Sequence, residues 1–239
     1  MSRAKAREPI WARPEPASGR AAYTRADIAA AAVRIADAEG LEAVSMRRVA
    51  ADLGAGTMSL YHYVRDKDDL VALMTDLVVG DYLVDEALLD RGWREGLSAI
   101  AHATRAALRD HRWTLRSSTL PVLGPNTMAH VDQTARAAAQ MDVEPAVYME
   151  IAGMLDEYVF GCLAREIAME GHDGGVDAEY WQSLIETGAF PHIAAVVAAH
   201  AEAGGDPNDL GRNTDPDGRF ARGLERLLDG VAAELARRR

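Results

Sequence analysis

The sequence predicts an all-α protein in which a small N-terminal domain of the helix-turn-helix type precedes a larger helical body. Alanine is abundant and aromatic residues make up only 6% of the chain, a composition that favours helix. Apolar residues recur at three- and four-residue spacing, and no stretch alternates as a strand does. The length of 239 residues allows one or two domains with a sizeable core.

Cysteine content and hydropathy exclude several classes of protein. The single cysteine, Cys162, cannot form an internal disulfide or a cysteine-based zinc site. The N-terminus does not resemble a signal peptide, and no apolar run approaches the roughly 18–20 residues of a membrane span. We therefore expect a cytoplasmic protein that has no membrane partner.

Charge is distributed unevenly along the chain. The net charge is −11, but residues 1–67 carry 11 Lys or Arg against 8 Asp or Glu, whereas the remainder carries 15 against 29. This distribution indicates that only the front of the chain approaches a polyanion. Charge alone leaves the alternative open, namely a solvated acidic surface with an incidental basic tail.

The first helices are marked by capping residues. Residues 1–22, with prolines and scattered arginines, predict a flexible basic arm. Residues 23–68 predict a three-helix domain, whose first helix begins at a capping-box pattern of Thr24 and Asp27 and ends at Gly40.

The next two helices form a helix-turn-helix pattern. Ser45 caps the second helix, and a Gly-Ala-Gly turn separates it from a third helix over residues 57–64. Leu60 and Val64 lie four apart and are expected to pack inward, whereas so short a helix is unstable alone. Hydroxyl, thioether and ring groups on its outer side suit base edges, a thymine methyl and phosphates. The residues expected to face a partner are Thr57, Met58, Ser59, Tyr61, His62 and Tyr63. The alternative is that Tyr61 and Tyr63 are half-buried packing residues.

Residues 69–239 form the predicted helical body. Asp66 can cap a fourth helix that runs on towards Leu88. Prolines and glycines separate the further helices. Helices are expected over residues 93–110 and 113–118, and from a turn at 124–126 to about residue 140. Others are expected over 145–170, in two pieces within 178–203, and over 220–235.

The segment from Thr24 to about Leu73 resembles the TetR family of bacterial transcriptional regulators. It contains a first helix ending in Ala-Glu-Gly-Leu, then Ser-Met-Arg-Arg-Val-Ala-Ala-Asp-Leu-Gly, then Leu-Tyr-His-Tyr-Val followed by Asp-Lys. The resemblance implies that Thr57, Met58 and Ser59 read base edges, and that the Tyr-His-Tyr run meets phosphates or flanking bases. It also implies that Arg47 contacts the backbone or a guanine, and that Lys67 anchors a phosphate.

The body resembles the tetracycline-repressor-like subgroup of this family. Trp93 opens a helix that ends in Leu-Arg-Asp-His-Arg, and Leu-Gly-Pro-Asn-Thr and Phe-Gly-Cys-Leu follow at similar separations. The resemblance implies a ligand-binding and dimerisation domain in which a small molecule releases the protein from DNA. In the tetracycline repressor a His and a Glu hold a magnesium–tetracycline chelate, and these places fall near Val122 and Arg165 here. We therefore expect no metal or other cofactor, and a hydrophobic drug or metabolite as the effector.

Residues 145–170 are apolar nearly all round, which predicts a helix covered on both sides and a homodimer interface shared with residues 220–235. Asp156 amid apolar neighbours needs a partner, which could be Arg165, Arg116, His102 or a bound cation. A structural pair and plain core packing remain the alternatives. The candidate ligand-binding residues are His102, Trp113, Arg116, Met128, Asp132, Met149, Met154, Asp156 and Phe160.

The sequence thus favours a ligand-responsive transcriptional repressor that binds a palindromic double-stranded operator as a homodimer and is released by a small hydrophobic molecule. An all-helical enzyme is the alternative from another class, but the seven histidines are scattered and no phosphate loop or nucleophile elbow appears. We therefore expect no catalytic activity. A ligand-independent DNA-binding protein is a third reading, which leaves the large body without a purpose.

Overall fold

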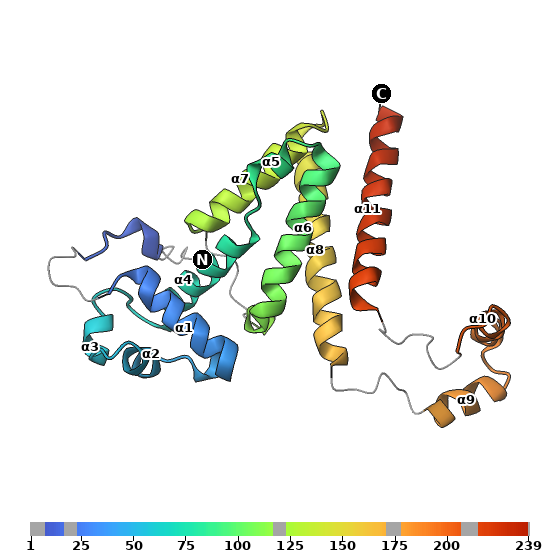
Figure 1. Ribbon diagram of the computed structural model, residues 1–239, viewed down its shortest axis with the longest axis horizontal. Coiled ribbons are helices and arrows are strands. Elements are labelled where there is room, and N and C mark those ends of the chain that lie inside the picture. Colours follow the sequence, from blue (N-terminus) through green and yellow to red (C-terminus); the bar gives the residue numbers. More distant parts are fainter. Residues whose placement is uncertain (1–7, 17–22, 117–122, 171–177, 207–214, 239) are drawn as a thin grey trace, which may run out of the picture. The chain divides into compact units, whose positions relative to one another are not determined.

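The computed structural model describes residues 8–16, 23–116, 123–170, 178–206 and 215–238, and within them it contains helices and turns but no strand (Figure 1). The all-α prediction is confirmed. Contacts group the chain into two compact units, residues 1–160 and 161–239. No single helix in the described ranges is long and apolar enough to cross a membrane, although one bent pair, Tyr180–Glu186 with Pro191–Glu202, passes that test together.

The N-terminal helices begin where the sequence predicts. Helix α1 (Arg25–Glu39) starts at the capping box of Thr24 and Asp27, and Gly40 ends it with φ 87°. A 3-10 turn, η2 (Leu41–Ala43), leads to α2 (Met46–Asp52), where the Ser45 hydroxyl accepts a hydrogen bond from the Arg48 N–H at 3.2 Å. These three elements and α3 form the head.

Helix α3 is shorter than predicted, because it covers only Thr57–Leu60 rather than residues 57–64. After Leu60 the backbone tightens into a turn, because the His62 and Tyr63 N–H groups donate three residues back, to the Ser59 and Leu60 carbonyls at 3.3 and 2.9 Å. The Tyr63 carbonyl beyond the helix accepts from the Arg25 Nε at 3.2 Å. Leu60 and Val64 are nevertheless buried, as the pattern predicts.

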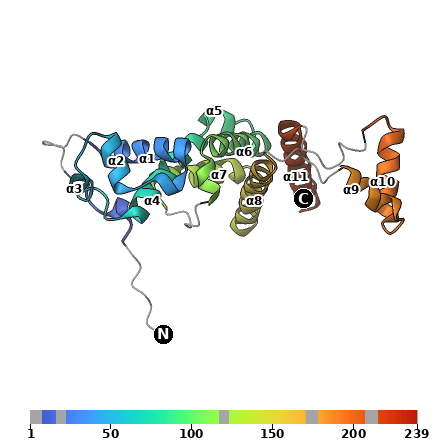
Figure 2. The same cartoon turned by 90° about the horizontal axis from the view of Figure 1, so that it is seen from below.

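Helix α4 (Lys67–Val79) packs along α1 and leads from the head to the body (Figures 1 and 2). The prediction that it reaches Leu88 is wrong. The chain instead forms η3 (Gly80–Tyr82) and α5 (Glu86–Leu89). Between them, the Val84 N–H donates to the Gln133 amide oxygen at 3.0 Å and the Val84 carbonyl accepts from its nitrogen at 2.9 Å, so this backbone bonds to another helix instead of to itself.

The body of the first unit is built from α6 (Trp93–Asp110), α7 (Pro125–Ala139) and the first part of α8 (Pro145–Met169). Helices α6 and α7 pack together, and a 3-10 segment, η4 (Arg112–Arg116), follows α6. Pro125 and Pro145 each stand at the first position of a helix, where the missing N–H costs no hydrogen bond.

The second unit contains α9 (Ala178–Glu186), α10 (Pro191–Glu202) and α11 (Pro216–Arg238). Helix α11 begins four residues before the predicted start and buries one stripe of side chains, Phe220, Leu224, Leu228 and Val231. Helix α10 contains no buried residue.

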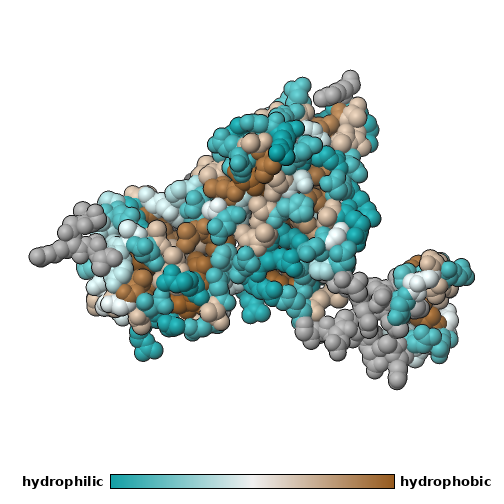
Figure 3. All heavy atoms as spheres, in the orientation of Figure 1, coloured by the Kyte–Doolittle hydropathy of each residue, from teal (hydrophilic) through white to brown (hydrophobic). Residues whose placement is uncertain are grey.

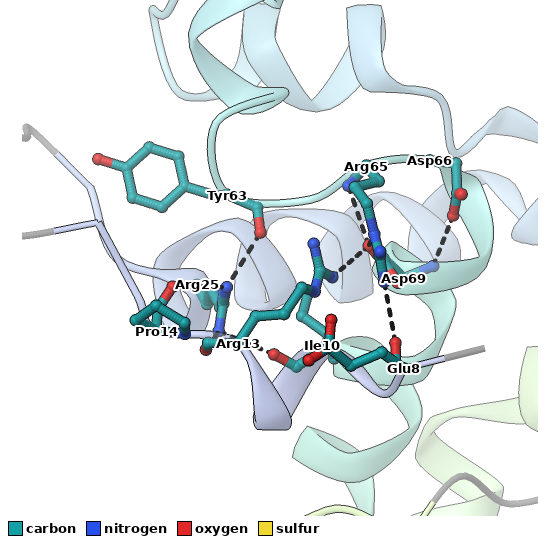
Figure 4. Close-up of polar contacts among 9 residues, drawn as sticks. All are labelled: Glu8, Ile10, Arg13, Pro14, Arg25, Tyr63, Arg65, Asp66 and Asp69. Atoms are coloured by element: carbon teal, nitrogen blue, oxygen red, sulfur yellow. Dashed lines mark hydrogen bonds and ion pairs between the residues drawn. The ribbon is translucent and has the colours of Figure 1, made fainter. Parts of the chain in front are cut away.

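The N-terminal arm differs from the loose segment that the sequence predicts, at least over residues 8–16. Ile10 begins the 3-10 turn η1 (Ile10–Ala12) and is 1% exposed. Figure 4 shows the Arg25 guanidinium among backbone carbonyls of the arm. It donates to Ile10 at 3.0 Å, Arg13 at 2.9 Å and Pro14 at 3.2 Å. A single buried guanidinium thus fastens the arm to α1, and sequence patterns gave no sign of this.

Candidate nucleic-acid interface and effector pocket

The outer side of α3 presents a row of accessible side chains. Met58 is 76% exposed and Tyr61 45% exposed, while Ser59 and His62 are also exposed and Thr57 is half-buried. Leu60 on the inner side is 1% exposed and holds α3 on the head. An exposed methionine and aromatic residue on so short a helix suit contact with another molecule better than packing.

Tyr63 corrects the prediction that the whole Tyr-His-Tyr run faces outward. Its side chain is 8% exposed. Tyr63 lies beyond the end of α3, so it does not follow the helical spacing on which the prediction was based. The packing alternative therefore holds for Tyr63, whereas Tyr61 and His62 remain at the surface.

Two cations flank this surface without a carboxylate partner among the described residues. Arg47 and Lys67 are both exposed. The neighbouring Arg48 is instead paired with Glu39 at 2.7 Å, which raises the pKa of Arg48. Arg47 and Lys67 thus keep their charges available for phosphate.

A small cavity lies in the body between α6, α7 and α8. Its volume is about 10 Å³, which is room for about one water molecule. Its walls are mostly aliphatic and include two threonines and one carboxylate: Leu97, Ile100, Ala101, Thr104, Thr134, Ala152, Leu155, Asp156 and Val159.

Of the nine residues predicted to bind a ligand, only Asp156 lines this cavity. Trp113 is buried but donates its Nε1–H to Asp37 of α1 at 2.9 Å, so it joins the head to the body. The remaining seven are exposed: His102, Arg116, Met128, Asp132, Met149, Met154 and Phe160. Sequence periodicity placed these side chains on helices correctly but could not tell an inner face from an uncovered outer one. Of the two positions compared with the tetracycline repressor, Arg165 is exposed and Val122 lies outside the described residues.

The polar groups near the cavity are poorly supplied with partners. Desolvation raises the pKa of Asp156 to about 6, although the side chain still reaches the surface. None of the cationic partners expected for it makes a hydrogen bond or ion pair with it in the described ranges. Thr104, 2% exposed, has a hydroxyl with no hydrogen-bond partner within those ranges.

Two further residues of this region escaped sequence reasoning. Tyr82 and His130 meet edge to face, with ring centroids 5.4 Å apart. Burial raises the pKa of Tyr82, as do the charges of Asp156 and Asp81, and burial lowers the pKa of His130. Tyr82 comes from η3, directly after α4, so the aromatic pair links the end of α4 to α7.

The head and body of the first unit are tied by two polar joints. At the first, Asp76 of α4 accepts from the N–H and hydroxyl of Thr127, both at 2.9 Å, and from the Asn126 N–H at 3.3 Å. At the second, the His111 ring lies 2.9 Å from Asp37 of α1 and 3.3 Å from Asp81. The bonds of Asp76 couple α4 to α7, so a movement of the start of α7 also moves α4.

No three His, Cys, Asp or Glu side chains in the described part of the chain gather as a metal site would require. The described residues thus form an exposed short helix beside unpaired cations, an aliphatic cavity, and polar contacts that connect the two. These features suit the binding of other molecules by shape and charge.

Comparison with known proteins identifies this combination. The family described as "Bacterial regulatory proteins, tetR family" matches residues 28–74, and the one described as "Tetracyclin repressor-like, C-terminal domain" matches residues 87–235. The HTH-type transcriptional repressor DrrR1 of Streptomyces coeruleorubidus is 36% identical over 87% of this chain and 77% of its own length. An HTH-type transcriptional regulator of Saccharopolyspora erythraea is 32% identical over 94% and 91%.

Solved structures agree with these matches. Apo ActR from Streptomyces coelicolor superposes with a TM-score of 0.75 at 26% identity, covering 92% of this chain and all of ActR. ActR in complex with actinorhodin gives a TM-score of 0.72 at 26% identity, covering 90% of this chain and 97% of that one. Relatives of this kind are regulators rather than enzymes. The chain belongs to the TetR family of bacterial transcriptional regulators.

Proposed function

We propose that this protein is a ligand-responsive transcriptional repressor that binds a palindromic operator as a homodimer and leaves it when a small hydrophobic molecule enters the body. One observation carries the proposal: the same chain has an exposed recognition surface on α3 and a cavity in the body, and α4 connects the two. In this division, residues 23–68 bind DNA and residues 69–239 bind the effector and the second subunit.

Sequence choice belongs to α3 in this proposal. Thr57, Met58 and Ser59 meet base edges, Tyr61 and His62 meet phosphates or flanking bases, and Arg47 and Lys67 hold the backbone. All of these residues except the half-buried Thr57 are exposed, which supports these roles. Tyr63 supports the recognition helix by packing, since its ring is buried.

Effector entry must enlarge the cavity. Its centre holds about one water molecule, so a drug-sized molecule fits only if α6, α7 and α8 separate. Helix α7 pulls on α4 through Asp76 when it moves. A molecule that requires the enlarged cavity therefore favours a different setting of α4 from the one that fits DNA, which is the differential affinity that release requires. ActR, a related regulator, has been solved with actinorhodin and with (S)-DNPA, which supports a small-molecule effector here.

The second subunit is expected on α8. Met149 is 56% exposed and Phe160 39% exposed, and Gly153 and Gly161 have open space where a Cβ would stand. Glycines and apolar side chains on an uncovered helix suit close helix–helix packing. Figure 3 shows hydrophobic atoms, in brown, at the surface between hydrophilic ones. Two copies joined in this way would place two recognition helices on half-sites about one DNA turn apart.

The test begins with operator sequences selected in vitro from random duplex DNA by the full-length protein. Selection of an inverted repeat, bound by two chains per duplex in analytical ultracentrifugation, is the expected result. A Gly153→Trp variant should abolish this stoichiometry, whereas Ala106→Trp, at an exposed position of α6 outside both helices of the proposed interface, should keep it. Selection of single half-sites bound by one chain would contradict the proposal.

A further inference from the structure

A second and larger pocket lies in the first unit, outside the cavity between α6 and α8. It measures about 370 Å³, within the usual range for a small-molecule site. The docked arm forms one wall, α1 and α4 form two others, and the start of α7 closes one side. Its lining residues are Trp11, Arg13, Glu15, Arg25, Ala26, Ala29, Leu73, Asp76, Leu77 and Asn126.

The floor and lid of this pocket are apolar. Ala26 and Ala29 lie one turn apart on α1, and Leu73 and Leu77 lie one turn apart on α4. Trp11 of the arm is wedged against the start of α7, since a Cβ on Gly124 would stand 2.6 Å from the indole ring. A flat ring has apolar walls on both sides here.

The cations of the pocket have unused capacity. Arg13 pairs with Asp69 through one Nη, and its Nε has no acceptor in the described ranges (Figure 4). A guanidinium has five N–H donors, so Arg13 retains donors for another acceptor. Burial lowers the pKa of Arg25, and the neighbouring Arg13 charge lowers it further. A guanidinium with a buried Nε–H that lacks an acceptor among the described residues, close to a second guanidinium, favours an entering anionic acceptor.

The carboxylates of the lining are already engaged. Asp76 accepts from the first turn of α7, and Glu15 accepts from the Arg25 N–H at 2.5 Å. The carboxylate that reaches Arg13 is Asp69, which also accepts from the Arg65 N–H at 3.0 Å. None of these carboxylates accepts from the Arg13 Nε–H, which is the donor that remains for an entering acceptor.

We propose that this arm pocket is a second small-molecule site, which takes a planar aromatic carboxylate with its ring between Trp11 and Leu73 and its carboxylate on Arg13. The site is separate from the effector cavity between α6 and α8. Its walls come from α1, α4 and the start of α7, so a bound molecule bridges the head and the body. The molecule is therefore expected to change the affinity of the protein for the operator, and the operator changes the affinity of the protein for the molecule by the same factor.

Calorimetry with the full-length protein tests the site without DNA, so its outcome is independent of the proposed repressor function. The probes are 1-naphthoate and its neutral counterpart 1-naphthamide. The filling variant is Ala26→Phe, which leaves Arg13 in place. The matched control is Ala38→Phe, an equally exposed alanine of α1 outside the pocket. Melting curves first establish that both variants fold as the wild type does.

The wild type should bind naphthoate more tightly than naphthamide at one site per chain. Ala26→Phe should lower the affinity for naphthoate by about tenfold or more, because the new ring occupies the apolar space that the naphthalene ring would fill. Ala38→Phe should leave this affinity within about twofold of the wild-type value. Arg13→Gln should lower the affinity for naphthoate to that for naphthamide. If Ala26→Phe binds naphthoate as tightly as the wild type does, the arm pocket is not the binding site. Equal affinity for the two probes in the wild type, or no binding at millimolar concentration, overturns the anion assignment.

Discussion

Asp76 caps helix α7 from outside it, because its Oδ1 accepts both the Thr127 N–H and the Thr127 hydroxyl at 2.9 Å. The carboxylate is 5% exposed. It therefore neutralises the positive end of α7 without competition from water, and fixes that end to α4. The joint thus holds two helices together through buried hydrogen bonds.

Removing the carboxylate should loosen that joint. Asp76→Ala should lower the free energy of unfolding by about 2–4 kcal/mol, since it leaves three buried donors without their acceptor. Thr127→Ala removes only the hydroxyl bond and should cost about 1 kcal/mol. Urea unfolding followed by circular dichroism measures both. Faster amide exchange in the first turn of α7 of Asp76→Ala, with unchanged exchange in α2, would locate the effect. Equal stability of the two variants would contradict the capping role.

Base reading and phosphate binding should respond differently to substitution. Thr57→Ala or Ser59→Ala should alter which bases are preferred, at about 1–3 kcal/mol per lost contact. Lys67→Ala should weaken binding to every duplex and reduce the salt slope by about one unit. Arg91→Ala, an exposed cation of the body, serves as the control. Fluorescence anisotropy on selected and scrambled duplexes measures these effects. Uniform weakening on all sequences by the Thr57 and Ser59 variants would remove base reading from α3.

Arg25 should be intolerant even of lysine. Arg25→Lys keeps the charge but loses the planar fork that reaches four backbone carbonyls, so the free energy of unfolding should fall by about 2–4 kcal/mol. The arm should also separate from the head, which chymotrypsin would report as faster cleavage after Trp11, a site followed by Ala12. Arg34→Lys is the matched control on α1, because Arg34 lies at the surface in a pair with Asp52. Unchanged cleavage after Trp11 in Arg25→Lys would show that other contacts hold the arm.

Asp156 should make stability depend on pH. Its pKa of about 6 lies above the usual 3.8, so the folded protein binds this proton more tightly than the unfolded chain does. Stability from this group is complete below pH about 4 and is lost as pH rises through about 6. The full shift corresponds to about 3 kcal/mol, which the solvent access of Asp156 reduces to about 1 kcal/mol.

Asp156→Asn should therefore stabilise the protein above pH 6 and have little effect at pH 4. Urea midpoints of both proteins across this range measure the difference. Asp132→Asn, another exposed carboxylate of the body, should show no such crossover. A constant difference between wild type and Asp156→Asn at every pH would mean that packing rather than charge distinguishes them.

Local patterns predicted the helices because capping residues and helical spacing act over a few neighbours. The cap at Thr24, the helix end at Gly40 and the proline start of α8 are all of this kind. Helix α7 begins at Pro125, within the turn predicted at 124–126. The end of α4 was not predictable, because Gln133 withdraws the Val84 backbone from any helix across 49 residues of chain. Tertiary hydrogen bonds of this sort leave no trace in periodicity.

The candidate sites divide along the same line. The outward face of α3 was predictable because exposure follows from spacing on a short helix, except at Tyr63, which lies in the turn after the helix has ended. The effector cavity was predicted poorly, because its lining threonines look like ordinary helix residues in sequence. The arm pocket could not be foreseen at all, since its walls meet only after Arg13 reaches Asp69 over 56 positions.

The end of α4 at Val79 gives that helix the dimensions of a short lever. Thirteen residues at 1.5 Å each span about 20 Å, with Asp76 near one end and the exposed Lys67 at the other. Asp76 and Lys67 lie nine residues apart, about 14 Å along the helix. A rotation of about 8° at Asp76 would displace Lys67 by about 2 Å, which in the proposed operator complex exceeds the tolerance of a hydrogen bond to phosphate. Had α4 continued to Leu88, the same tilt would be shared with a stretch packed into the body. In the proposed repressor, the early end of α4 lets a small shift at the joint with α7 move Lys67 away from its phosphate.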